Sequence, residues 1–542
     1  MKSEAKSKKY DVVIVGSGVA GSLVAHSLVQ RGISCLMLEA GARLDRGQLL
    51  DRFQNAAVKD TMAPYPSLKH APHPIPSRPD DYLIQKGPDR YDSQYIRAVG
   101  GTTWHWAAAA WRLLPNDFRL KSTYGVGRDW GLAYDTLEPY YGKAEGTLGV
   151  SGDKNEDLGS PRSHPYPMGP IPLSYMDSTF SRELNRVGYK VVTEPVARNS
   201  QPFDGRPQCC GNNNCMPICP IGAQYSGDVH ARKAEGAGTK LVPNAVADFI
   251  EVDALGKVSR VRYRDPSGTA QWAVGRYFVL AANGIETPKL LLLSRSVRTP
   301  KGVANSSDQV GRNLMDHPGT AMTFLVPKPL YPGRGPQEMT SIVNLRDGAF
   351  RKEFSAKKIH LSNQVDTNGI TKELLAKNLY GKALDQKIKQ LSLRRLRLDA
   401  FHEILPDPEN RIVPSESLSD GLGIPRPEIH YRIGDYVRKS AQDTRSHFAK
   451  IAAAMGGEEA QFLDDFAPNS HLMGTTIMGT IGKDSVVNTD CQTHDHSNLF
   501  IASSAVFASA ACVNPTLTIA ALSLRLADHL HRKLKSKVSV GA

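Results

Sequence analysis

The sequence lacks the long apolar runs and the cysteine framework that mark two large classes of protein. Its most apolar window, Leu499–Val513, is shorter than the roughly 18 residues that a membrane-spanning helix needs, and it contains several serines. Seven cysteines in 542 residues are too few for a fold held by disulfides. The basic N-terminus passes into a strand without an apolar stretch and cleavage site, so we expect no signal peptide and no transmembrane helix in this chain.

No block of like charge dominates the chain, although its net charge is +13. The 67 basic and 54 acidic residues are spread along the sequence, and only short basic clusters such as 6–9 and 394–397 interrupt this pattern. A basic surface can attract nucleic acid, but the sequence contains no nucleic-acid-binding module, and we expect no such partner. The length indicates two or three domains.

The N-terminal segment has the pattern of a dinucleotide-binding βαβ unit. Val12–Val15 is a β-branched run typical of a strand buried on both faces, and Val19–Val29 has helical periodicity. A second predicted strand, Cys35–Leu38, ends at Glu39, about 20 residues after the first glycine, where an acid accepts ribose hydroxyls. The glycines that permit the tight turn, approach of the pyrophosphate and close helix packing are Gly16, Gly18 and Gly21. The motif alone does not distinguish FAD from NAD.

Four of the seven cysteines lie in one short loop, QCCGNNNCMPICP at 208–220: Cys209, Cys210, Cys215 and Cys219. A disulfide, a zinc site and an iron–sulfur cluster all fit this composition. Zinc sites more often show two separated cysteine pairs or added histidines, and a disulfide between adjacent cysteines would be strained. The spacing suits several thiolates around one compact cluster, but the residues alone leave the three alternatives open.

Further motifs occur in a fixed order after the N-terminal unit: IRAVGGTTWHWAAAAWR at 96–112, AANGIETPKLLLLS at 281–294, VGRNLMDHPG at 310–319 and NPTLTIAALSLRLAD at 514–528. Together they resemble the glucose–methanol–choline (GMC) oxidoreductase family over essentially the whole chain. Stretches such as TMAPYPS, EPVARNSQPFDGRPQCCGNNNC and RGPQEMTS resemble the catalytic subunits of bacterial membrane-bound sugar dehydrogenases, the glucose type first and the fructose type next.

This resemblance implies an α/β fold with a Rossmann-like FAD-binding domain and a substrate domain built on an antiparallel sheet. We expect a discontinuous FAD domain over 1–160, 205–315 and 460–542, and a substrate domain over 161–204 and 316–459. Beyond the N-terminal motif, the residues expected to contact FAD are Gly100, Gly101, Thr102, His105, Trp106, Ala282 and Asn283. In some relatives the histidine matching His105 is bonded covalently to the flavin, and at His105 a covalent bond and a noncovalent contact both stay open.

The resemblance also implies oxidation of a sugar hydroxyl by hydride transfer to FAD, with D-glucose, oxidised to gluconolactone, as the first expected substrate. The matching motifs make His471 the catalytic base and Asn514 its partner. An imidazole suits this role because its pKa lies near working pH. The related sugar dehydrogenases tend to have asparagine before the base, whereas this chain has Ser470, which we expect to contact the substrate. His317 is expected to be structural.

In the resembling subunits the cysteine loop holds a 3Fe–4S cluster. We expect Cys209, Cys215 and Cys219 as its ligands, with Cys210 in reserve, because adjacent residues seldom both face one cluster. The resemblance implies two partners: a small subunit that carries the export signal and a multihaem cytochrome c subunit. The expected location is therefore the periplasmic side of the inner membrane, and the expected electron acceptor is a cytochrome or a dye rather than oxygen.

Two alternatives stay open. One is a dehydrogenase for another sugar or polyol, such as fructose, sorbitol, gluconate or a glycoside, and the other is an electron-transfer subunit with a vestigial active site. The lysine-rich stretch Lys372–Arg397 has helical spacing and is expected to form a solvated helix.

Overall fold

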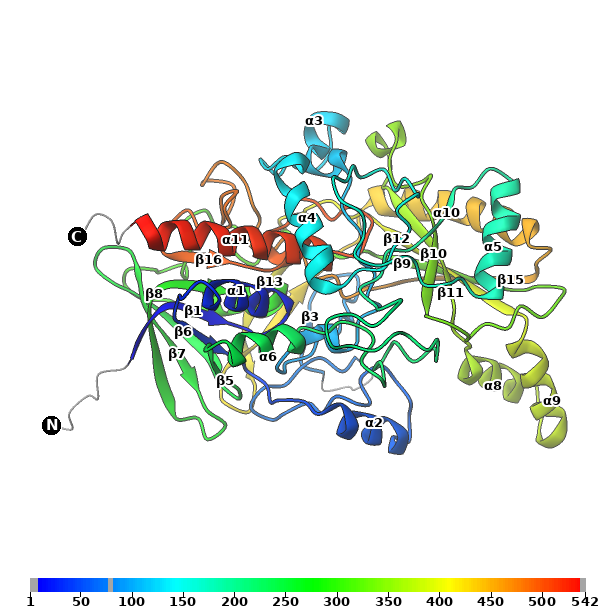
Figure 1. Cartoon of the computed structure of the whole chain (residues 1–542), viewed down its shortest axis with the longest axis horizontal. Helices are drawn as coiled ribbons and strands as arrows, with labels where there is room; N and C mark the ends of the chain where they lie inside the picture. The colour runs from blue at the N-terminus through cyan, green and yellow to red at the C-terminus, as the bar shows by residue number, and fades with distance from the viewer. Residues whose placement is uncertain (1–7, 77–80, 537–542) are drawn as a thin grey trace.

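The computed structural model describes residues 8–76 and 81–536 (Figure 1). Its first βαβ unit forms as the sequence predicts, with β1 (Lys9–Val15) parallel to β2 (Cys35–Leu38) and α1 (Val19–Val29) between them. A Cβ atom at Gly21 would lie 2.0 Å from the carbonyl oxygen of Gly16. Only glycine at position 21 therefore lets the helix pack this closely on the end of the strand.

The first sheet is assembled from distant parts of the chain. Its order is β5-β2-β1-β8-β7-β6, and β16 pairs with the end of β8. The β5, β2, β1, β8 and β16 pairings are parallel, whereas β6, β7 and β8 form an antiparallel meander. The remaining bounds are β5 (Lys240–Val242), β6 (Val246–Val252), β7 (Val258–Arg264), β8 (Ala270–Leu280) and β16 (Leu499–Ile501).

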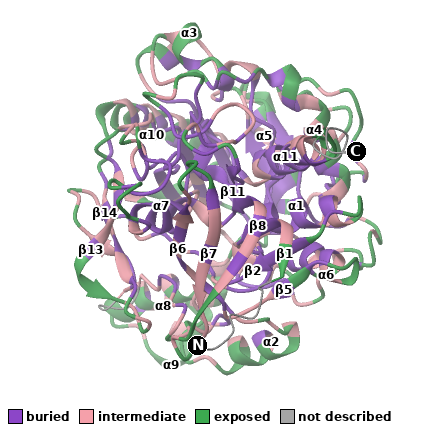
Figure 2. Cartoon of the chain, turned by 90° about the vertical axis from the view of Figure 1, so that its left-hand side faces the viewer, coloured by how far each residue is buried: buried purple, intermediate pink, exposed green. Residues whose placement is uncertain are grey.

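Helices from both ends of the chain cover this sheet. α11 (Thr516–Ser536) lies against α1 and α4 (Tyr134–Leu148), and α1 also packs against α6 (Asp228–Gly236) (Figure 1). α7 (Asn283–Leu293) packs against β6. The largest apolar core forms here, and Figure 2 shows buried residues gathered where α1 and α11 meet the sheet.

The second sheet is antiparallel throughout, in the order β15-β9-β12-β11-β10-β4. Helices α5 (Tyr175–Arg186) and α10 (Asp435–Ala454) share a second apolar core with it. This confirms the expected fold class. The strand bounds are β4 (Val191–Thr193), β9 (Gly319–Leu325), β10 (Glu338–Ile342), β11 (Lys357–Ser362), β12 (Arg395–His402) and β15 (Glu458–Ala467).

A small third sheet, β13-β14-β3, lies beside the first domain. Its strands are β3 (Ile84–Gln85), β13 (Arg411–Ser419) and β14 (Pro425–His430). β13 and β14 pack against α7, although they come from the segment predicted to form the substrate domain. The predicted domain boundaries stay predictions. The short remaining elements are α2 (Arg46–Asn55), α3 (Leu120–Tyr124) and the 3-10 turns at Gly101–Trp104, Pro115–Phe118, Ala349–Lys352 and Ser504–Val506.

The expected single helix over Lys372–Arg397 is wrong. Two helices, α8 (Thr367–Ala376) and α9 (Gly381–Ser392), form a hairpin that projects from the second domain (Figure 1). Asn378, between the two helices, and Gly381, the first residue of α9, have positive φ values, which break the helix. The arginine cluster then enters β12, whose alternating burial follows strand rather than helix periodicity.

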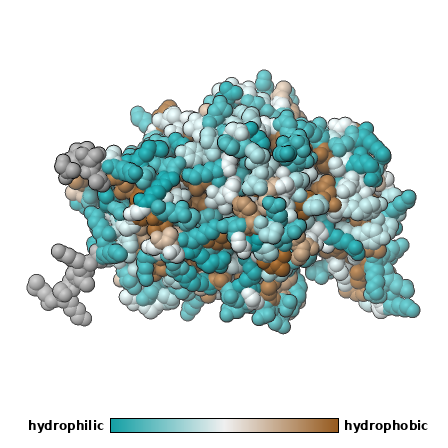
Figure 3. Space-filling model, viewed as in Figure 1, coloured by the Kyte–Doolittle hydropathy of each residue, from teal (hydrophilic) through white to brown (hydrophobic). Residues whose placement is uncertain are grey.

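The face of the molecule seen in Figure 3 is mostly hydrophilic, with scattered apolar patches. In the described part of the chain, no helix combines the length and apolar character needed to cross a membrane.

Candidate active site

One cavity of about 390 Å³ runs from the dinucleotide turn to the second sheet. It brings together most of the residues predicted to bind cofactor or substrate. Gly21 and Gly100 are the exceptions, because Gly21 packs beneath the turn and Gly100 against α6. The predicted residues that line it are Gly16, Gly18, Glu39, Gly101, Thr102, His105, Trp106, Ala282, Asn283, Ser470, His471 and Asn514.

At the dinucleotide end, Glu39 is buried at the end of β2. Its carboxylate accepts hydrogen bonds from the backbone N–H and hydroxyl of Ser17, at 3.0 and 2.7 Å, and from the N–H of Gly41 at 3.0 Å. Burial raises the pKa of Glu39. These bonds hold the acid rigidly at the predicted ribose position. Both bonds from Ser17 go to Oε2, so Oε1 is the oxygen that keeps lone-pair capacity for a ligand.

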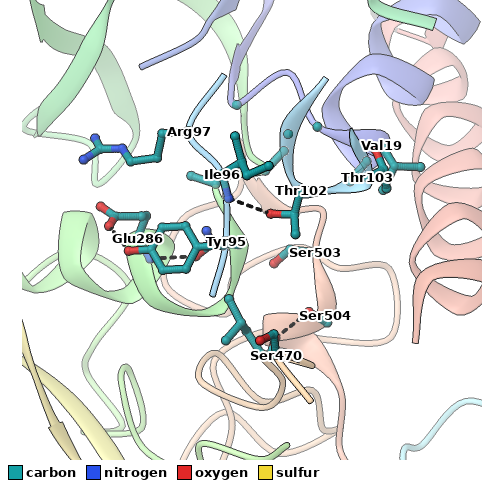
Figure 4. Close-up of a pocket in the computed structure, with 18 of the residues that line it drawn as sticks. Val19, Tyr95, Ile96, Arg97, Thr102, Thr103, Glu286, Ser470, Ser503 and Ser504 are labelled. Carbon is teal, nitrogen blue, oxygen red and sulfur yellow. Dashed lines mark hydrogen bonds between the residues drawn. The ribbon is translucent and has the colours of Figure 1, made fainter. Parts of the chain in front are cut away.

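The glycine pair of the GGTTWHW segment meets the dinucleotide turn directly. A Cβ atom at Gly101 would lie 2.9 Å from the Cα of Gly18, so the two glycine segments pack backbone to backbone. Thr102 accepts a hydrogen bond from the N–H of Ile96 at 3.2 Å (Figure 4). The indole of Trp106 donates to the carbonyl of Tyr225 at 2.7 Å. Contacts to backbone atoms therefore fix the position of this part of the cavity wall.

His105 is buried in this wall. Its Nε2 atom has no hydrogen-bond partner among the described residues, and its ring centroid lies 5.6 Å from that of Tyr65. Burial lowers the pKa of His105 to about 4, so the imidazole is neutral at pH 7. A buried, neutral and unpartnered imidazole nitrogen in a cofactor cavity is suited to a direct contact with the bound group.

A buried polar cluster on the cavity wall was missed by sequence reasoning. The hydroxyl of Tyr95 donates to Glu286 at 2.6 Å, and Lys289 forms an ion pair with Glu286 at 2.8 Å. Figure 4 shows Tyr95 and Glu286 side by side, with Arg97 nearby. Burial acts to raise the pKa of Glu286, but the charges of Lys289 and Arg97 outweigh it and lower the pKa to about 2. Polar residues inside the apolar run of α7 were the available signal.

At the opposite end, the predicted base contacts a second histidine. Nδ1 of His471 lies 2.7 Å from Nδ1 of His317, and Nε2 of His471 lies 3.4 Å from the amide nitrogen of Asn514. Nε2 of His317 faces the carbonyl oxygens of Ala510 and Ala511, each at 3.1 Å. The expectation that His317 is only structural did not anticipate its contact with the predicted base.

These contacts determine where the protons lie. Carbonyl oxygens only accept hydrogen bonds, so Nε2 of His317 carries the hydrogen and its Nδ1 is an acceptor. Burial lowers the pKa of His317 to about 4, which keeps it neutral. Nδ1 of His471 must then donate to His317, and Nε2 of His471 keeps a lone pair, which faces the amide nitrogen of Asn514. The pair therefore presents the tautomer that a general base needs.

A buried carboxylate joins the backbone of the two histidines. Asp316 accepts hydrogen bonds from the N–H of His317 at 2.6 Å and of His471 at 3.0 Å, and burial raises its pKa to about 6. These three side chains are close enough to hold a metal ion. Since both ring nitrogens of His317 already face hydrogen-bonding partners, we interpret the group as a hydrogen-bonded unit.

Asn514 is itself held by a buried ion pair that sequence reasoning missed. Lys358 is fully buried and donates to the amide oxygen of Asn514 at 3.2 Å and to Glu194 at 2.9 Å. Because an ammonium only donates, the Asn514 amide must turn its NH₂ group towards His471. Burial lowers the pKa of His471 well below its ordinary value, and the nearby His317 and Lys358 act in the same direction.

Ser470 lines the cavity next to the predicted base. Its hydroxyl oxygen accepts a hydrogen bond from the N–H of Gln94 at 2.9 Å, and its φ of 60° places it in the left-handed region. The hydroxyl hydrogen stays available to donate.

The cysteine loop lies against the same cavity. Met216, within the loop, lines it, and the hydroxyl of Tyr65, whose ring faces His105, donates to the carbonyl of Pro217 at 2.5 Å. Gln224 bridges the carbonyls of Trp106 and Cys215, at 2.6 and 3.4 Å. Any group held by the loop would therefore lie next to the cavity wall.

Three of the loop thiols lie close enough for their charges to interact. Burial raises the pKa of Cys209, and the nearby thiols of Cys215 and Cys219 act in the same direction, whereas Cys210 is exposed. All seven cysteines are free, which argues against the disulfide alternative. The sulfur atoms do not gather within 4.8 Å of one another in the described structure, as thiolates around a single zinc ion would.

Comparisons with known proteins agree with this site. The GMC oxidoreductase family model matches residues 406–523. The fructose dehydrogenase large subunit of Gluconobacter japonicus is 50% identical over 534 residues, which cover 97% of this chain and 98% of that protein. The chain belongs to the GMC oxidoreductase family. It is thus an FAD-dependent oxidoreductase, as the sequence resemblance implied.

Two more distant relatives extend this picture. This GMC oxidoreductase is 26% identical to the 2-methyl-1,2-propanediol dehydrogenase of Mycolicibacterium austroafricanum, over 97% of this chain and 96% of that protein. A solved structure of Aspergillus oryzae formate oxidase superposes with a TM-score of 0.66 at 16% identity, covering 98% of this chain and 99% of the other. The latter likeness concerns the fold alone.

The histidine geometry predicts the pH dependence of flavin reduction. Since the pKa of His471 is lowered, its Nε2 stays unprotonated until the pH falls below the ordinary histidine value of 6.5. We expect kcat/KM for flavin reduction by an alcohol substrate to be flat near neutral pH and to fall only below pH 6.5. Replacing the buried pair by Lys358→Met with Glu194→Gln removes both of its charges, of which that of Lys358 lowers the pKa of His471, so the acid limb should move to higher pH.

The matched control is Lys357→Met, which removes a neighbouring buried lysine on the other face of β11 that pairs with Asp443. It should leave the acid limb in place. Stopped-flow bleaching of the flavin between pH 4 and 8 measures both. An acid limb centred above pH 7 in the unmutated protein would contradict the assignment.

Proposed function

We propose that this GMC oxidoreductase is the catalytic subunit of a sugar or polyol dehydrogenase. The observation that carries the proposal is the unprotonated Nε2 of His471, which is held by His317 and faces the amide of Asn514 in the cavity that also contains the dinucleotide turn. FAD, when bound, supplies the hydride acceptor. The protein must then supply a base for the hydroxyl proton, a means of orienting the hydroxyl and a site that excludes water.

The side chains at this end divide these tasks. His471 accepts the hydroxyl proton at Nε2, and the proton on its Nδ1 stays shared with His317. The NH₂ group of Asn514, oriented by Lys358, donates to the substrate oxygen. A positioned base of this kind contributes roughly 10²–10⁴-fold to the rate.

Another part of the cavity wall supports a polyhydroxyl substrate. Glu338 lines the cavity and is largely buried, and its Oε2 atom has no hydrogen-bond partner among the described residues. His360 lies 3.8 Å from the other oxygen of Glu338. An unpartnered buried carboxylate oxygen is a suitable acceptor for a second substrate hydroxyl. Ser470 offers a further donor.

D-glucose and D-fructose are the first substrates to test. The sequence resemblance placed the glucose type first, whereas the 50% identical relative is named a fructose dehydrogenase, the type placed second. Sorbitol and gluconate belong in the same panel.

We further propose that Cys209, Cys215 and Cys219 hold a 3Fe–4S cluster, with Cys210 outside the ligand set. The mutual approach of three thiols and the exposure of Cys210 support this assignment. Such a cluster carries single electrons, and the loop's position beside the cavity suits a relay to an external acceptor rather than to oxygen.

The partners are also part of the proposal. The Gluconobacter relative is named a large subunit, which supports an assembly with other subunits. We propose a small subunit that carries the export signal and a multihaem cytochrome c subunit, with the complex on the periplasmic side of the inner membrane.

The central test is His471→Ala in the protein purified with its small subunit. Sugar-dependent dye reduction should fall by roughly 10²–10⁴-fold, with the flavin absorption spectrum unchanged, because the proposed role of His471 is proton transfer and the residues expected to contact FAD lie elsewhere. Asn469→Ala, which removes a side chain bonded to the carbonyl of His317, controls for local packing. Full turnover in His471→Ala would mean another base, and no turnover by the unmutated protein with any sugar would support the electron-transfer alternative.

We propose a covalent bond between His105 and the flavin, since its buried Nε2 is unpartnered among the described residues. Acid precipitation of the unmutated protein should give a yellow pellet, and His105→Ala should release the flavin into the supernatant. A colourless pellet from the unmutated protein would favour the noncovalent contact.

Cys215→Ser should retain FAD but lose the iron-dependent EPR signal and slow cytochrome reduction, because one buried cluster ligand is removed. Cys210→Ser is the matched control and should retain the full iron content, since that thiol is exposed. Equal iron loss in both variants would contradict the ligand assignment.

A further inference from the structure

Arg198 lies directly behind the cysteine loop. The N–H of Cys209 donates to the carbonyl of Asn199, the residue that follows Arg198, at 2.9 Å. On the other side, Arg198 forms an isolated β-bridge with Gln224. The backbone of Arg198 is thus clamped between the loop and the segment that contains Gln224.

The guanidinium of Arg198 is buried and only partly paired. Arg198 is 1% exposed, and its Nη2 atom donates to the carbonyl of Ala107 at 3.0 Å and to the amide oxygen of Gln224 at 2.7 Å. Its Nε and Nη1 atoms are buried and have no partner among the described residues. Within 8–76 and 81–536, no carboxylate forms an ion pair with Arg198.

A buried, unpaired guanidinium is strongly unfavourable, because the charge loses its hydration without gaining a counter-ion. Buried N–H groups are almost always hydrogen-bonded. Two free donors and one uncompensated charge at the same place therefore indicate that an anionic acceptor completes the site.

The thiols supply that anion. The chain segment that carries the Arg198 guanidinium is bonded to the loop at Cys209, whose N–H donates to the carbonyl of Asn199 at 2.9 Å. The amide of Gln224 links the same guanidinium to the carbonyl of Cys215. Metal groups bind cysteine as thiolate, so a group held by three cysteines carries the negative charge that the guanidinium lacks.

We propose that Arg198 is the buried counter-ion of the cysteine-bound iron–sulfur cluster, donating hydrogen bonds to it from Nε and Nη1 and raising its reduction potential. This inference rests on the proposed cluster. Reduction adds one electron to the cluster and breaks no bond, so the cluster becomes more negative by one charge. A fixed positive charge beside it favours the reduced form.

A second arginine at the loop provides the comparison. Arg46 is half-buried and donates to the carbonyl of Cys219 at 2.6 Å. Its charge is near the same loop but partly solvated, so solvent screens it more strongly than it screens Arg198.

The test uses the chain with its small subunit, reconstituted without air, and the variants Arg198→Gln, Arg198→Lys and Arg46→Gln. Iron is assayed first, and a dithionite titration followed by EPR then gives the cluster potential. At a fixed poise, Arg198→Gln should lower the ratio of reduced to oxidised cluster at least tenfold, which is 59 mV for one electron. Arg198→Lys should retain most of the potential, and Arg46→Gln should shift it less.

Each outcome decides the proposal. An unchanged potential in an iron-loaded Arg198→Gln protein, or an equal shift in Arg46→Gln, overturns it. If Arg198→Gln cannot load iron but Arg198→Lys can, the need for charge is supported, whereas failure of both indicates a packing role and overturns it. An unmutated protein without iron refutes the proposed cluster itself, a result distinct from a variant that fails.

Discussion

Two backbone carbonyls decide the chemistry of this active site. Those of Ala510 and Ala511 accept from Nε2 of His317, and this fixes the proton on one nitrogen of a neutral imidazole. Its other nitrogen must then accept from His471, whose remaining nitrogen is left as the base. These backbone hydrogen bonds thus specify the tautomer of His471 through His317. The network sets this tautomer without a carboxylate acceptor, whose buried charge would have to be neutralised.

The charges at the same end of the cavity are balanced. Lys358 brings a full positive charge to Asn514 and is balanced by Glu194, so the ion pair orients the amide without exposing a net charge to the substrate. Breaking such a pair on one side alone leaves a buried charge at a cost of about 3–5 kcal/mol. The pair therefore constrains the packing of the fold as well as the geometry of the site.

The local sequence pattern was sufficient to predict the first βαβ unit. Its strand, glycines and helix lie within one short window, and the strand and the helix each show their own hydrophobic periodicity. It was also sufficient for most cavity residues, which lie within motifs of the family. It did not reveal His317 as the partner of His471, since 154 residues separate the two and only the fold brings them together. Lys358 and Arg198 were missed for a related reason. From sequence alone a basic residue is expected at the surface, and only tertiary packing shows that it is buried. The lysine-rich stretch was misassigned because the helix break and the change to strand periodicity are short.

The last elements of the chain complete the first domain. Asn514 immediately precedes α11, which packs against α1, and β16 joins the sheet only at residue 499. During synthesis the opening βαβ unit consequently emerges from the ribosome long before the strand and helix that cover it. Until α11 has emerged, the face of α1 that it covers stays exposed, and exposed apolar surface of this kind is prone to aggregation.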